Sequence, residues 1–476
     1  MSDGLEVVRR ALAGRPAWLV GGAVRDRALG RGTANVDVDV VVEGDPGEAA
    51  RAVAGAAGRA PCFALSERFG AWRVVARDRS WQVDVEPLRA QTLADDLALR
   101  DFTVNAIAEP IAGGAPIDPL GGLADLSAGR LRMAGPDAFA DDPLRVLRLV
   151  RVAVELGLEP ERDTLRMAGA AAGRLADVSA ERVFMELRRI VAAPRAVDGL
   201  QMSGELGVTE VVLPELVAMQ GIKQSRFHHL DVFGHTLEVL QRAVELTTVG
   251  ALQMPALQAP LGQSWPAVAT LLAEPLADEM SRGEALRWGA LLHDVAKPLT
   301  REVRGPQRRV TFIGHDVRGA DVARSVLARL RASERLRAHV AALVGNHLRL
   351  GFLVHEPQPL ALRSVYAYLH ACSPVEVDVT LLSVLDRLAT RGEGARDAID
   401  AHLRLAESVL EDALAWHEQG PPAPLLRGDE LAGALGIATG PRVGQLLDSL
   451  AEAQYAGEVT TGDQAIAYAR ALLANL

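Results

Sequence analysis

The 476-residue chain is poor in two residue types: Cys62 and Cys372 are its only cysteines, and Lys223 and Lys297 are its only lysines. Two thiols are too few for a disulfide framework, which excludes a disulfide-rich secreted domain and predicts a reducing, cytoplasmic setting. Basic charge therefore rests almost entirely on arginine, a bias that a GC-rich genome alone would produce.

The chain also lacks long apolar runs. No stretch is long and apolar enough to span a bilayer, and residues 1–12 carry charges without the apolar centre of a signal peptide. The formal net charge of -10 excludes a generally basic coat for nucleic acid, although a local arginine-rich face could still bind a polyanion. With 49% hydrophobic residues the chain can bury large cores, and its length predicts several domains.

Near the N-terminus, an apolar strand ends in Gly21 and Gly22, and a helix is expected to follow. Paired glycines let the backbone approach a bulky anion, and the amides at a helix N-terminus point toward such an anion. Asp37 and Asp39 come next on a β-run, where alternate residues face the same side. Carboxylates beside a phosphate cradle suit Mg²⁺, which binds a few carboxylates together with substrate phosphates. This combination predicts phosphoryl or nucleotidyl transfer.

A third acid, Asp84, lies in the alternating run Gln82–Val85. On a strand beside Asp37 and Asp39 it would complete a three-carboxylate site for two Mg²⁺ ions. An Asp-x-Asp pair by itself would be a solvated strand edge. The two glycines before it and the acid after it favour the catalytic interpretation.

Residues 1–135 mix short β-runs with helices, and the pattern after Pro136 is helical. Asp142 and Pro143 are typical of a helix start, because proline suits the first helical position. The stretch Leu246–Pro275, with glycine and several prolines, indicates an insertion or loop. The expected elements are strands at Ala17–Val20, Val36–Val42, Ala71–Ala76 and Trp81–Glu86, and helices at Gly47–Ala57, Leu93–Leu99, Glu181–Val191, Gly234–Leu246, Ala285–His293 and Gly319–Ala332.

Five segments, in this order, resemble the signatures of class II tRNA nucleotidyltransferases, a family of CCA-adding enzymes and bacterial poly(A) polymerases. One such motif would be weak evidence, whereas five in the family's order are specific. The segments are Leu19–Asp26 with the Asp37-x-Asp39 pair, Arg100–Ala106, Asp118–Leu126, Asp141–Arg151 and Glu181–Leu187.

The resemblance implies a role for each matching residue. Asp37 and Asp39 would hold Mg²⁺ with Asp84 assisting, and an Asp142/Arg145 pair, one turn apart on a helix, would read the Watson–Crick edge of CTP or ATP. A carboxylate accepts from an exocyclic amine and a guanidinium donates to a ring nitrogen or carbonyl, so the chemistry is apt. The nucleotide-binding set that the resemblance implies is Gly21, Gly22, Arg25, Arg100, Asp101, Asn105, Asp142, Arg145, Arg148 and Arg151, of which Arg148 and Arg151 could instead form salt bridges on an amphipathic helix.

Two departures from the family pattern bear on specificity. The second motif usually begins with two arginines, but Leu99 replaces the first. The link from Asp84 to that motif, residues 86–96, is shorter than in complete CCA-adding relatives. In the family the longer loop is tied to switching from CTP to ATP, so the short link favours a CC-adding subtype, with full CCA addition as the alternative.

A second constellation lies further along the chain. The run Leu291–Pro298 resembles the central signature of HD phosphohydrolases, which implies His235, His293, Asp294 and Asp386 as metal ligands. His315 and His347 are additional histidines for a second ion or a phosphate. Imidazole and carboxylate ligands suit Mn²⁺, Ni²⁺, Co²⁺ or Zn²⁺, and such a site activates water for attack on phosphate esters. His228 and His229 fit no pattern, and surface or packing roles are expected for them.

The sequence thus predicts an α+β head, with a small mixed sheet, at residues 1–135. An all-α neck at 136–205, an HD body at 206–400 and a helical tail at 401–476 would follow. The expected reaction is transfer of CMP, and perhaps AMP, from CTP or ATP to a tRNA 3′ end with release of pyrophosphate. The alternatives are a poly(A) polymerase and an HD phosphohydrolase with a degenerate RNA-binding head. Arginines expected to meet RNA phosphates are Arg182, Arg188, Arg189, Arg301, Arg304, Arg308 and Arg309.

Overall fold

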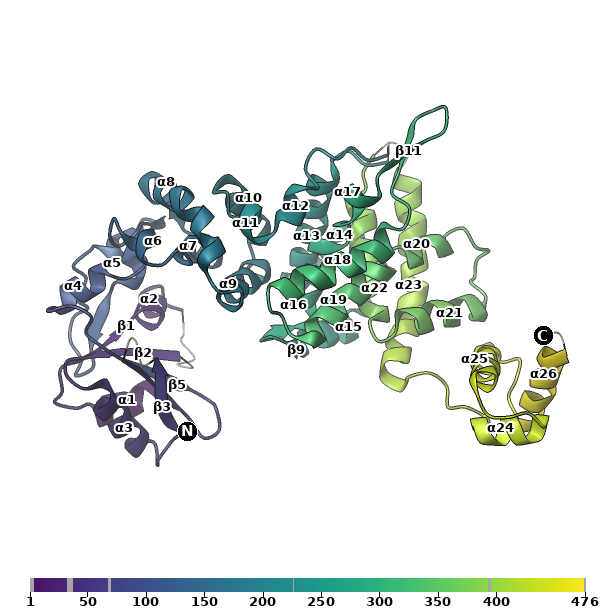
Figure 1. Ribbon diagram of the computed structural model, residues 1–476, viewed down its shortest axis with the longest axis horizontal. Coiled ribbons are helices and arrows are strands. Elements are labelled where there is room, and N and C mark those ends of the chain that lie inside the picture. Colours follow the sequence, from purple (N-terminus) through teal and green to yellow (C-terminus); the bar gives the residue numbers. More distant parts are fainter. Residues whose placement is uncertain (1–3, 32–36, 67–69, 226, 393–394, 475–476) are drawn as a thin grey trace. The chain divides into compact units, whose positions relative to one another are not determined.

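The computed structural model describes residues 4–31, 37–66, 70–225, 227–392 and 395–474 (Figure 1). The chain divides into two compact units: residues 1–186 with 199–212, and residues 187–198 with 213–476. Each unit is described by itself below. No described helix is long and apolar enough to cross a membrane.

The first unit contains a six-stranded mixed sheet in the order β3-β4-β5-β2-β1-β6. Only the β2–β5 pair is parallel, and the other neighbours are antiparallel. Helix α3 packs on β4 and β5, and α1 packs on α3. The bounds are α1 Gly4–Ala11, β1 Ala17–Val20, α2 Gly22–Ala28, β2 Asp37–Val42, α3 Pro46–Ala56, β3 Cys62–Ser66, β4 Ala71–Val75, β5 Gln82–Pro87, α4 Leu93–Ala98, β6 Ala108–Pro110 and α5 Gly122–Ser127.

Helices follow the sheet, as the change of periodicity predicts. Helix α7 buries Val146, Leu149, Val150 and Val154 at helical spacing. A short parallel pair, β7 Arg130–Leu131 with β8 Glu159–Pro160, is the one addition to the predicted neck among the described residues. The helices are α6 Ala138–Asp141, α7 Arg145–Leu156, α8 Arg162–Ala171, α9 Ala180–Ala192, α10 Ala196–Glu205 and α11 Thr209–Val212.

The second unit is almost entirely helical, with a core formed largely by α13, α16, α22 and α23. Three helices with their own small core end the chain. The bounds are α12 Pro214–Val217, α13 Val232–Thr248, α14 Pro255–Leu261, α15 Trp265–Ala273, α16 Arg282–Leu292, α17 Lys297–Thr300, α18 His315–Arg329, α19 Glu334–Asn346, α20 Arg349–Leu353, α21 Leu362–Cys372, α22 Glu376–Ala389, α23 Ala395–Gln419, α24 Gly428–Leu435, α25 Pro441–Tyr455 and α26 Gly462–Ala474. The predicted fold class, an α+β head followed by helices, is confirmed.

Several local predictions were wrong. The stretch 246–275 forms α14 and α15 rather than a loop, because Pro255 and Pro266 lie at helix starts, where proline is favoured. The segment that carries Arg301, Arg304, Arg308 and Arg309, all expected to meet RNA, forms a hairpin of β11 Glu302–Arg304 and β12 Arg309–Thr311, and β9 Pro275–Ala277 pairs with β10 Met280–Ser281. Strand β2 is described from Asp37, so the predicted Val36 start lies outside the described residues.

Candidate functional site

The three acids of the head lie side by side on β2 and β5. Val38 and Val40 alternate with Asp37 and Asp39 and are fully buried, so the two aspartates project from the opposite face of β2. In the parallel β2–β5 pair, Asp39 stands opposite Asp84. The chain therefore assembles the predicted carboxylates at one place on the sheet, as a site for divalent cations requires.

Asp39 and Asp84 differ in their electrostatic surroundings. Asp39 is accessible to solvent, yet it is closely surrounded by protein, and burial and the charge of Asp84 raise the pKa of Asp39 to about 6. Asp84 instead accepts two hydrogen bonds of 2.7 Å from the Arg73 guanidinium on β4. Sequence reasoning missed Arg73, because its partnership depends on the β4–β5 register, which places Arg73 opposite Asp84.

The paired glycines lie directly beside these acids. Gly21 has φ +73°, and a Cβ there would lie 3.1 Å from Asp39 Oδ2. A side chain at Gly21 would therefore strain the backbone and crowd the Asp39 carboxylate. Arg25 Nη1 donates to Asn105 Oδ1 at 2.7 Å and Arg25 Nε donates to Asp26 Oδ1 at 2.8 Å.

The Arg100 guanidinium lies near Gly21, and two of its nitrogen atoms form no hydrogen bond among the described residues. Its Nε and Nη2 are buried and form no hydrogen bond among the described residues, and the nearest carboxylate oxygen, Asp96 Oδ2, is 3.7 Å from Nη2. A Cβ on Gly21 would lie 3.8 Å from Arg100 Nη1. Nη1 is thus the Arg100 atom beside the glycines, whereas Nη2 faces the buried Asp96 carboxylate, and a guanidinium beside glycines and carboxylates suits an anionic ligand.

Asp101, by contrast, is fully engaged by protein. Its carboxylate accepts from Phe102 N at 2.8 Å and Asn105 Nδ2 at 3.0 Å, and Arg148 Nη1 lies 3.3 Å away. Burial alone would raise the pKa of Asp101, but the Arg148 charge and these hydrogen bonds hold it below its usual value. The environment keeps Asp101 ionised.

The Asp142/Arg145 pair does not lie on one helix as expected. Asp142 precedes α7, which begins at Arg145, and the Asp142 carboxylate accepts from Leu144 N at 3.2 Å and Arg182 Nη2 at 2.7 Å. Arg145 donates to three backbone carbonyls, those of Leu99 at 2.8 Å, Ala138 at 3.1 Å and Arg100 at 3.3 Å. In this state each member of the pair serves other partners.

Arg148 and Arg151 form salt bridges with acids of the same unit, which is the alternative that the sequence left open for them. Both guanidinium groups bind Glu186 of α9, and Arg151 also binds Glu155 at 2.9 Å. Arg182, expected to meet RNA, is occupied by Asp142 here. The role of Glu186 was not predicted, because nothing in its own segment indicates that it binds Arg148 and Arg151.

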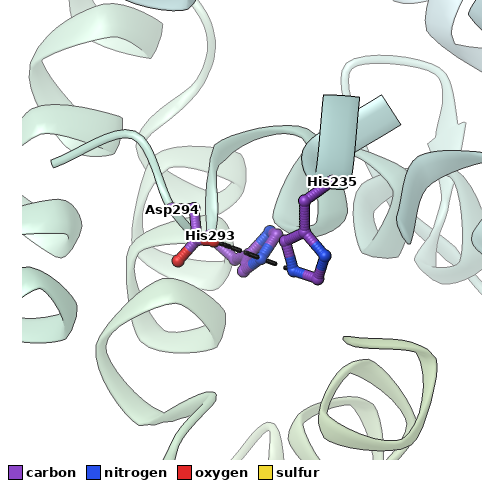
Figure 2. A group of neighbouring side chains, drawn as sticks. All are labelled: His235, His293 and Asp294. Atoms are coloured by element: carbon purple, nitrogen blue, oxygen red, sulfur yellow. Dashed lines mark ion pairs between the residues drawn. The ribbon is translucent and has the colours of Figure 1, made fainter. Parts of the chain in front are cut away.

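The second constellation comes together from five segments of the second unit. His235 lies on α13, His293 and Asp294 directly follow α16, His315 starts α18, His347 follows α19 and Asp386 lies on α22. His235 Nε2 is 2.8 Å from Asp386 Oδ1 and 3.8 Å from Asp294 Oδ2. Figure 2 shows His235 and His293 with their rings turned toward each other and toward Asp294. The structure thus brings all six predicted residues together. His235, His293, Asp294, His315 and His347 are buried, and Asp386 is partly exposed.

The donor set fits a divalent transition metal. His293 Nε2, His315 Nε2 and both Asp294 oxygens are buried and form no hydrogen bond of normal geometry among the described residues, although Lys297 Nζ lies 2.6 Å from Asp294 Oδ2. Buried polar atoms that lack partners are costly, and a cation held by His235, His293 and Asp294 would satisfy those of His293 and one Asp294 oxygen. Nitrogen and oxygen donors of this kind are typical ligands of Mn²⁺, Ni²⁺, Co²⁺ or Zn²⁺.

Three family models match the chain in order. Residues 17–132 match the poly A polymerase head domain, 157–219 the probable RNA and SrmB-binding site of polymerase A, and 267–390 the HD domain. An A-adding tRNA nucleotidyltransferase of Deinococcus radiodurans is 38% identical over 459 residues, with 95% of this chain and 94% of that protein covered. This chain belongs to the tRNA nucleotidyltransferase family. A CC-adding tRNA nucleotidyltransferase of Thermus thermophilus is 35% identical, with 95% and 93% covered.

Solved structures agree with the fold of this tRNA nucleotidyltransferase. A CCA-adding enzyme in its apo form superposes with a TM-score of 0.61 at 19% identity, covering 99% of this chain and 93% of that one. The Thermotoga maritima CCA-adding enzyme complexed with tRNA gives 0.58 at 18% identity, covering 98% and 95%. The predicted family, and with it the assignment as a nucleotidyltransferase, is confirmed.

Residues near the HD cluster that the sequence did not indicate are His228, Gln224 and Lys297. The His228 ring centroid lies 5.0 Å from that of His235, so the packing role, one of the two roles expected for His228, agrees with the structure. Lys297 Nζ donates to Gln224 Oε1 at 2.6 Å while pairing with Asp294. Lys297 stands four residues after His293, a spacing that could have indicated it.

The raised pKa of Asp39 predicts a pH dependence in the tRNA nucleotidyltransferase. As pH falls through about 6, Asp39 takes up a proton. A Mg²⁺ ion bound at Asp39, as the sequence predicts, would have to displace that proton, so the apparent affinity for Mg²⁺ should fall about tenfold per pH unit below the pKa. Mg²⁺ titration of nucleotide addition at several pH values measures this. Asp84→Asn should shift the onset to lower pH because it removes a negative neighbour, and an affinity that is constant from pH 7 to 5 would contradict the assignment.

Proposed function

We propose that this tRNA nucleotidyltransferase adds two CMP residues from CTP to the 3′ end of tRNA and then stops. Addition at the tRNA 3′ end follows from the family and from relatives that span nearly the whole chain. The observation that carries the CC specificity is the short, tied connection between β5 and α4. The location that we propose is the cytoplasm, where tRNA is processed.

The connection has only five residues, 88–92, between Pro87 at the end of β5 and Leu93 at the start of α4. The buried Asp96 carboxylate accepts from Arg89 N at 2.9 Å and Arg89 Nε at 3.3 Å. Leu88 N donates to Val42 O at 3.2 Å, and Thr92 Oγ1 accepts from Asp95 N at 3.2 Å. A five-residue segment held at both ends has less freedom to rearrange than a long flexible loop, which supports addition of one type of nucleotide.

We propose that Asp37 and Asp39 hold Mg²⁺, with Asp84 nearby and paired to Arg73. When bound, Mg²⁺ would lower the pKa of the tRNA 3′-hydroxyl and offset charge on the triphosphate. The 3′ oxygen bonds to the α-phosphorus of CTP, the bond from that phosphorus to the β-phosphate oxygen breaks, and pyrophosphate leaves. Arg100, whose Nη1 lies near Gly21, and the backbone at Gly21 and Gly22 would hold the triphosphate.

For base selection we propose Asp142 and Arg145, with a rearrangement on binding. Arg182 donates to Asp142, and three backbone carbonyls accept hydrogen bonds from Arg145. A cytosine edge would have to replace at least some of these partners. Arg148 and Arg151 would support the site by binding Glu186, and Arg148 also pairs with Asp101. Asn105 would support it through its hydrogen bonds with Asp101 and Arg25.

A specific observation favours a second candidate, single AMP addition. The Deinococcus radiodurans relative, at 38% identity, is named A-adding, and the Thermus thermophilus relative, at 35%, is named CC-adding. Because these two identities are so similar, they do not decide between A addition and CC addition. The short β5–α4 connection favours CC addition. CC addition and A addition can be distinguished by which tRNA 3′ end the enzyme extends.

The test uses a tRNA that lacks its three terminal nucleotides, with Mg²⁺ and CTP, ATP or both, and products are resolved to single nucleotides. We expect two added cytidines with CTP alone and no further growth when ATP is present. A complete CCA end would refute the proposed stop. Growth only on a tRNA that already ends in CC would establish A addition, and long A-tails on generic RNA would establish a poly(A) polymerase.

For the second unit we propose a metal-dependent phosphohydrolase site formed by His235, His293, Asp294 and Asp386. The metal would activate a water for attack on a phosphate ester. His235 holds Asp386 at 2.8 Å, and although burial alone would raise the pKa of Asp386, His235 holds it below its usual value. The carboxylates of Asp294 and Asp386 would therefore both be ionised when they bind the metal.

A further inference from the structure

One face of the head sheet continues beyond the three acids to an exposed aromatic side chain. Asp39 stands opposite Asp84 in the strand register. Asp84 stands opposite Arg73, and Arg73 stands opposite Phe63. Residues that stand opposite each other in neighbouring strands project from the same face of a sheet. The row therefore runs from β2 across β5 and β4 to the edge strand β3, a span of about 14 Å at the usual strand spacing.

This face is open, whereas the other face of the same strands is packed. Val74 and Val83 alternate with the row and are fully buried. Helix α3 packs on their side, where a Cβ on its Gly47 would lie 2.8 Å from the ring of Trp72. Phe63, on the open face, is 48% exposed. Its ring therefore gains little from packing within the head and is accessible to a ligand.

The proposed nucleotide site lies on the other side of β2 from this row. In the sheet order, β1 is on one side of β2, and β5, β4 and β3 are on the other. Gly21 follows β1, and together with Arg100 it forms the place proposed for the triphosphate. Arg145, proposed to read the base, donates to the carbonyl oxygen of Arg100. The side of the acids toward β5, β4 and β3 is thus left for the second substrate.

The geometry of phosphoryl transfer favours the same division. The attacking oxygen and the leaving oxygen stand roughly in line on either side of the α-phosphorus. With pyrophosphate leaving toward Gly21 and Arg100, the 3′-hydroxyl of the RNA has to arrive from the side of Asp84. The nucleotides that precede this hydroxyl would then lie over β5, β4 and β3.

The charges along the row suit an RNA strand. Arg73 is the only charged residue within β3 and β4 as the structure describes them, and it holds the Asp84 carboxylate through two hydrogen bonds. RNA phosphates that extend from the acids therefore meet no acidic side chain on these two strands. The Phe63 ring at the end of the row suits an unpaired base, because every nucleobase has a π face that can stack on an aromatic side chain.

We propose that Phe63 is a stacking platform for an unpaired base near the 3′ end of the acceptor RNA, with Arg73 between this base and the reacting centre. The inference rests on the proposed function, in that Asp39 marks the reacting centre and the acceptor is a tRNA end. It adds the side from which the acceptor approaches and a residue that contacts it.

The experiment measures single-turnover addition against tRNA concentration, with the tRNA end and the nucleotide that the parent enzyme accepts. Phe63→Ala and Phe63→Leu should weaken the apparent affinity for tRNA about tenfold to hundredfold, whereas Phe63→Tyr, which keeps the ring, should bind as the parent does. In every variant, the apparent affinity for the nucleotide and the rate at saturating tRNA should stay within about threefold of the parent. Ala64→Ser, at the exposed neighbour on the other face of β3, is the matched control and should change neither affinity.

Stacking itself is measured with a fluorescent adenine analogue placed in turn at the last positions of the acceptor, because stacking on a ring quenches its emission. The parent and Phe63→Tyr should quench the analogue more than Phe63→Ala does, and thermal unfolding confirms that each variant is folded. Unchanged tRNA affinity in folded Phe63→Ala would overturn the platform alone. The same result with an altered oligomeric state, measured by sedimentation, would instead assign Phe63 to a contact between copies of the chain. A parent enzyme that extends no tRNA end would overturn the proposed function itself.

Discussion

Asp39→Asn is expected to lower the rate of nucleotide addition by at least about a thousandfold, because it would remove the charge of a proposed Mg²⁺ ligand. The substitution keeps the shape of the side chain beside Gly21, where space is limited. It also removes the repulsion between Asp39 and Asp84, which stand opposite each other on β2 and β5. We therefore expect the melting temperature without Mg²⁺ to stay the same or rise.

The measurement is single-turnover addition of CMP to tRNA at saturating CTP, together with thermal unfolding. Glu43→Ala is the matched control, because Glu43 is an exposed acid directly after the other end of β2. The control should retain its rate, and metal binding by the HD site should be unchanged in both variants. Addition that survives Asp39→Asn within tenfold of the original rate would remove Asp39 from the metal site.

The second large effect is expected at a buried ion pair in the HD unit. Arg282, at the start of α16, donates three hydrogen bonds of 3.0, 2.8 and 2.5 Å to Asp378 on α22, and Asp378 is completely buried. Helix α16 ends directly before His293 and Asp294, and α22 carries Asp386. The pair therefore ties together two helices that position the proposed metal ligands.

Arg282→Met should destabilise the unit by about 3–5 kcal/mol, because it leaves the Asp378 charge buried without its partner. That corresponds to a fall in the melting temperature of roughly 10 °C. The double variant Arg282→Met with Asp378→Leu should recover much of the loss, since no unpaired charge remains. A single variant that unfolds within 2 °C of the parent would show that other groups already balance Asp378.

The parts of the structure that the sequence predicted are those with local signals. Strand β2 was predicted because Val38 and Val40 alternate with acids, and α7 because its apolar residues recur at helical spacing. The residues of the proposed HD site were predicted from the resemblance of the His293–Asp294 doublet, with the other residues following in order along the chain. The loop predicted around Pro255 and Pro266 was wrong, because proline disrupts the interior of a helix but is favoured at its start.

The parts that could not be predicted depend on pairing between distant segments. Nothing local to Arg73 shows that it lies opposite Asp84, because this follows from the strand register. Similarly, the carbonyls that hold Arg145 lie in segments up to 46 residues away. His228 has no pattern of its own, and only the folded chain brings it to His235.

The most direct test of the account compares two tRNA substrates in single turnover: one lacking all three terminal nucleotides, supplied with CTP, and one ending in CC, supplied with ATP. The tied β5–α4 connection predicts rapid CMP addition to the first and at least a hundredfold slower AMP addition to the second. Rapid AMP addition to the CC-ended tRNA would contradict the account and would assign the last step of end repair to this enzyme.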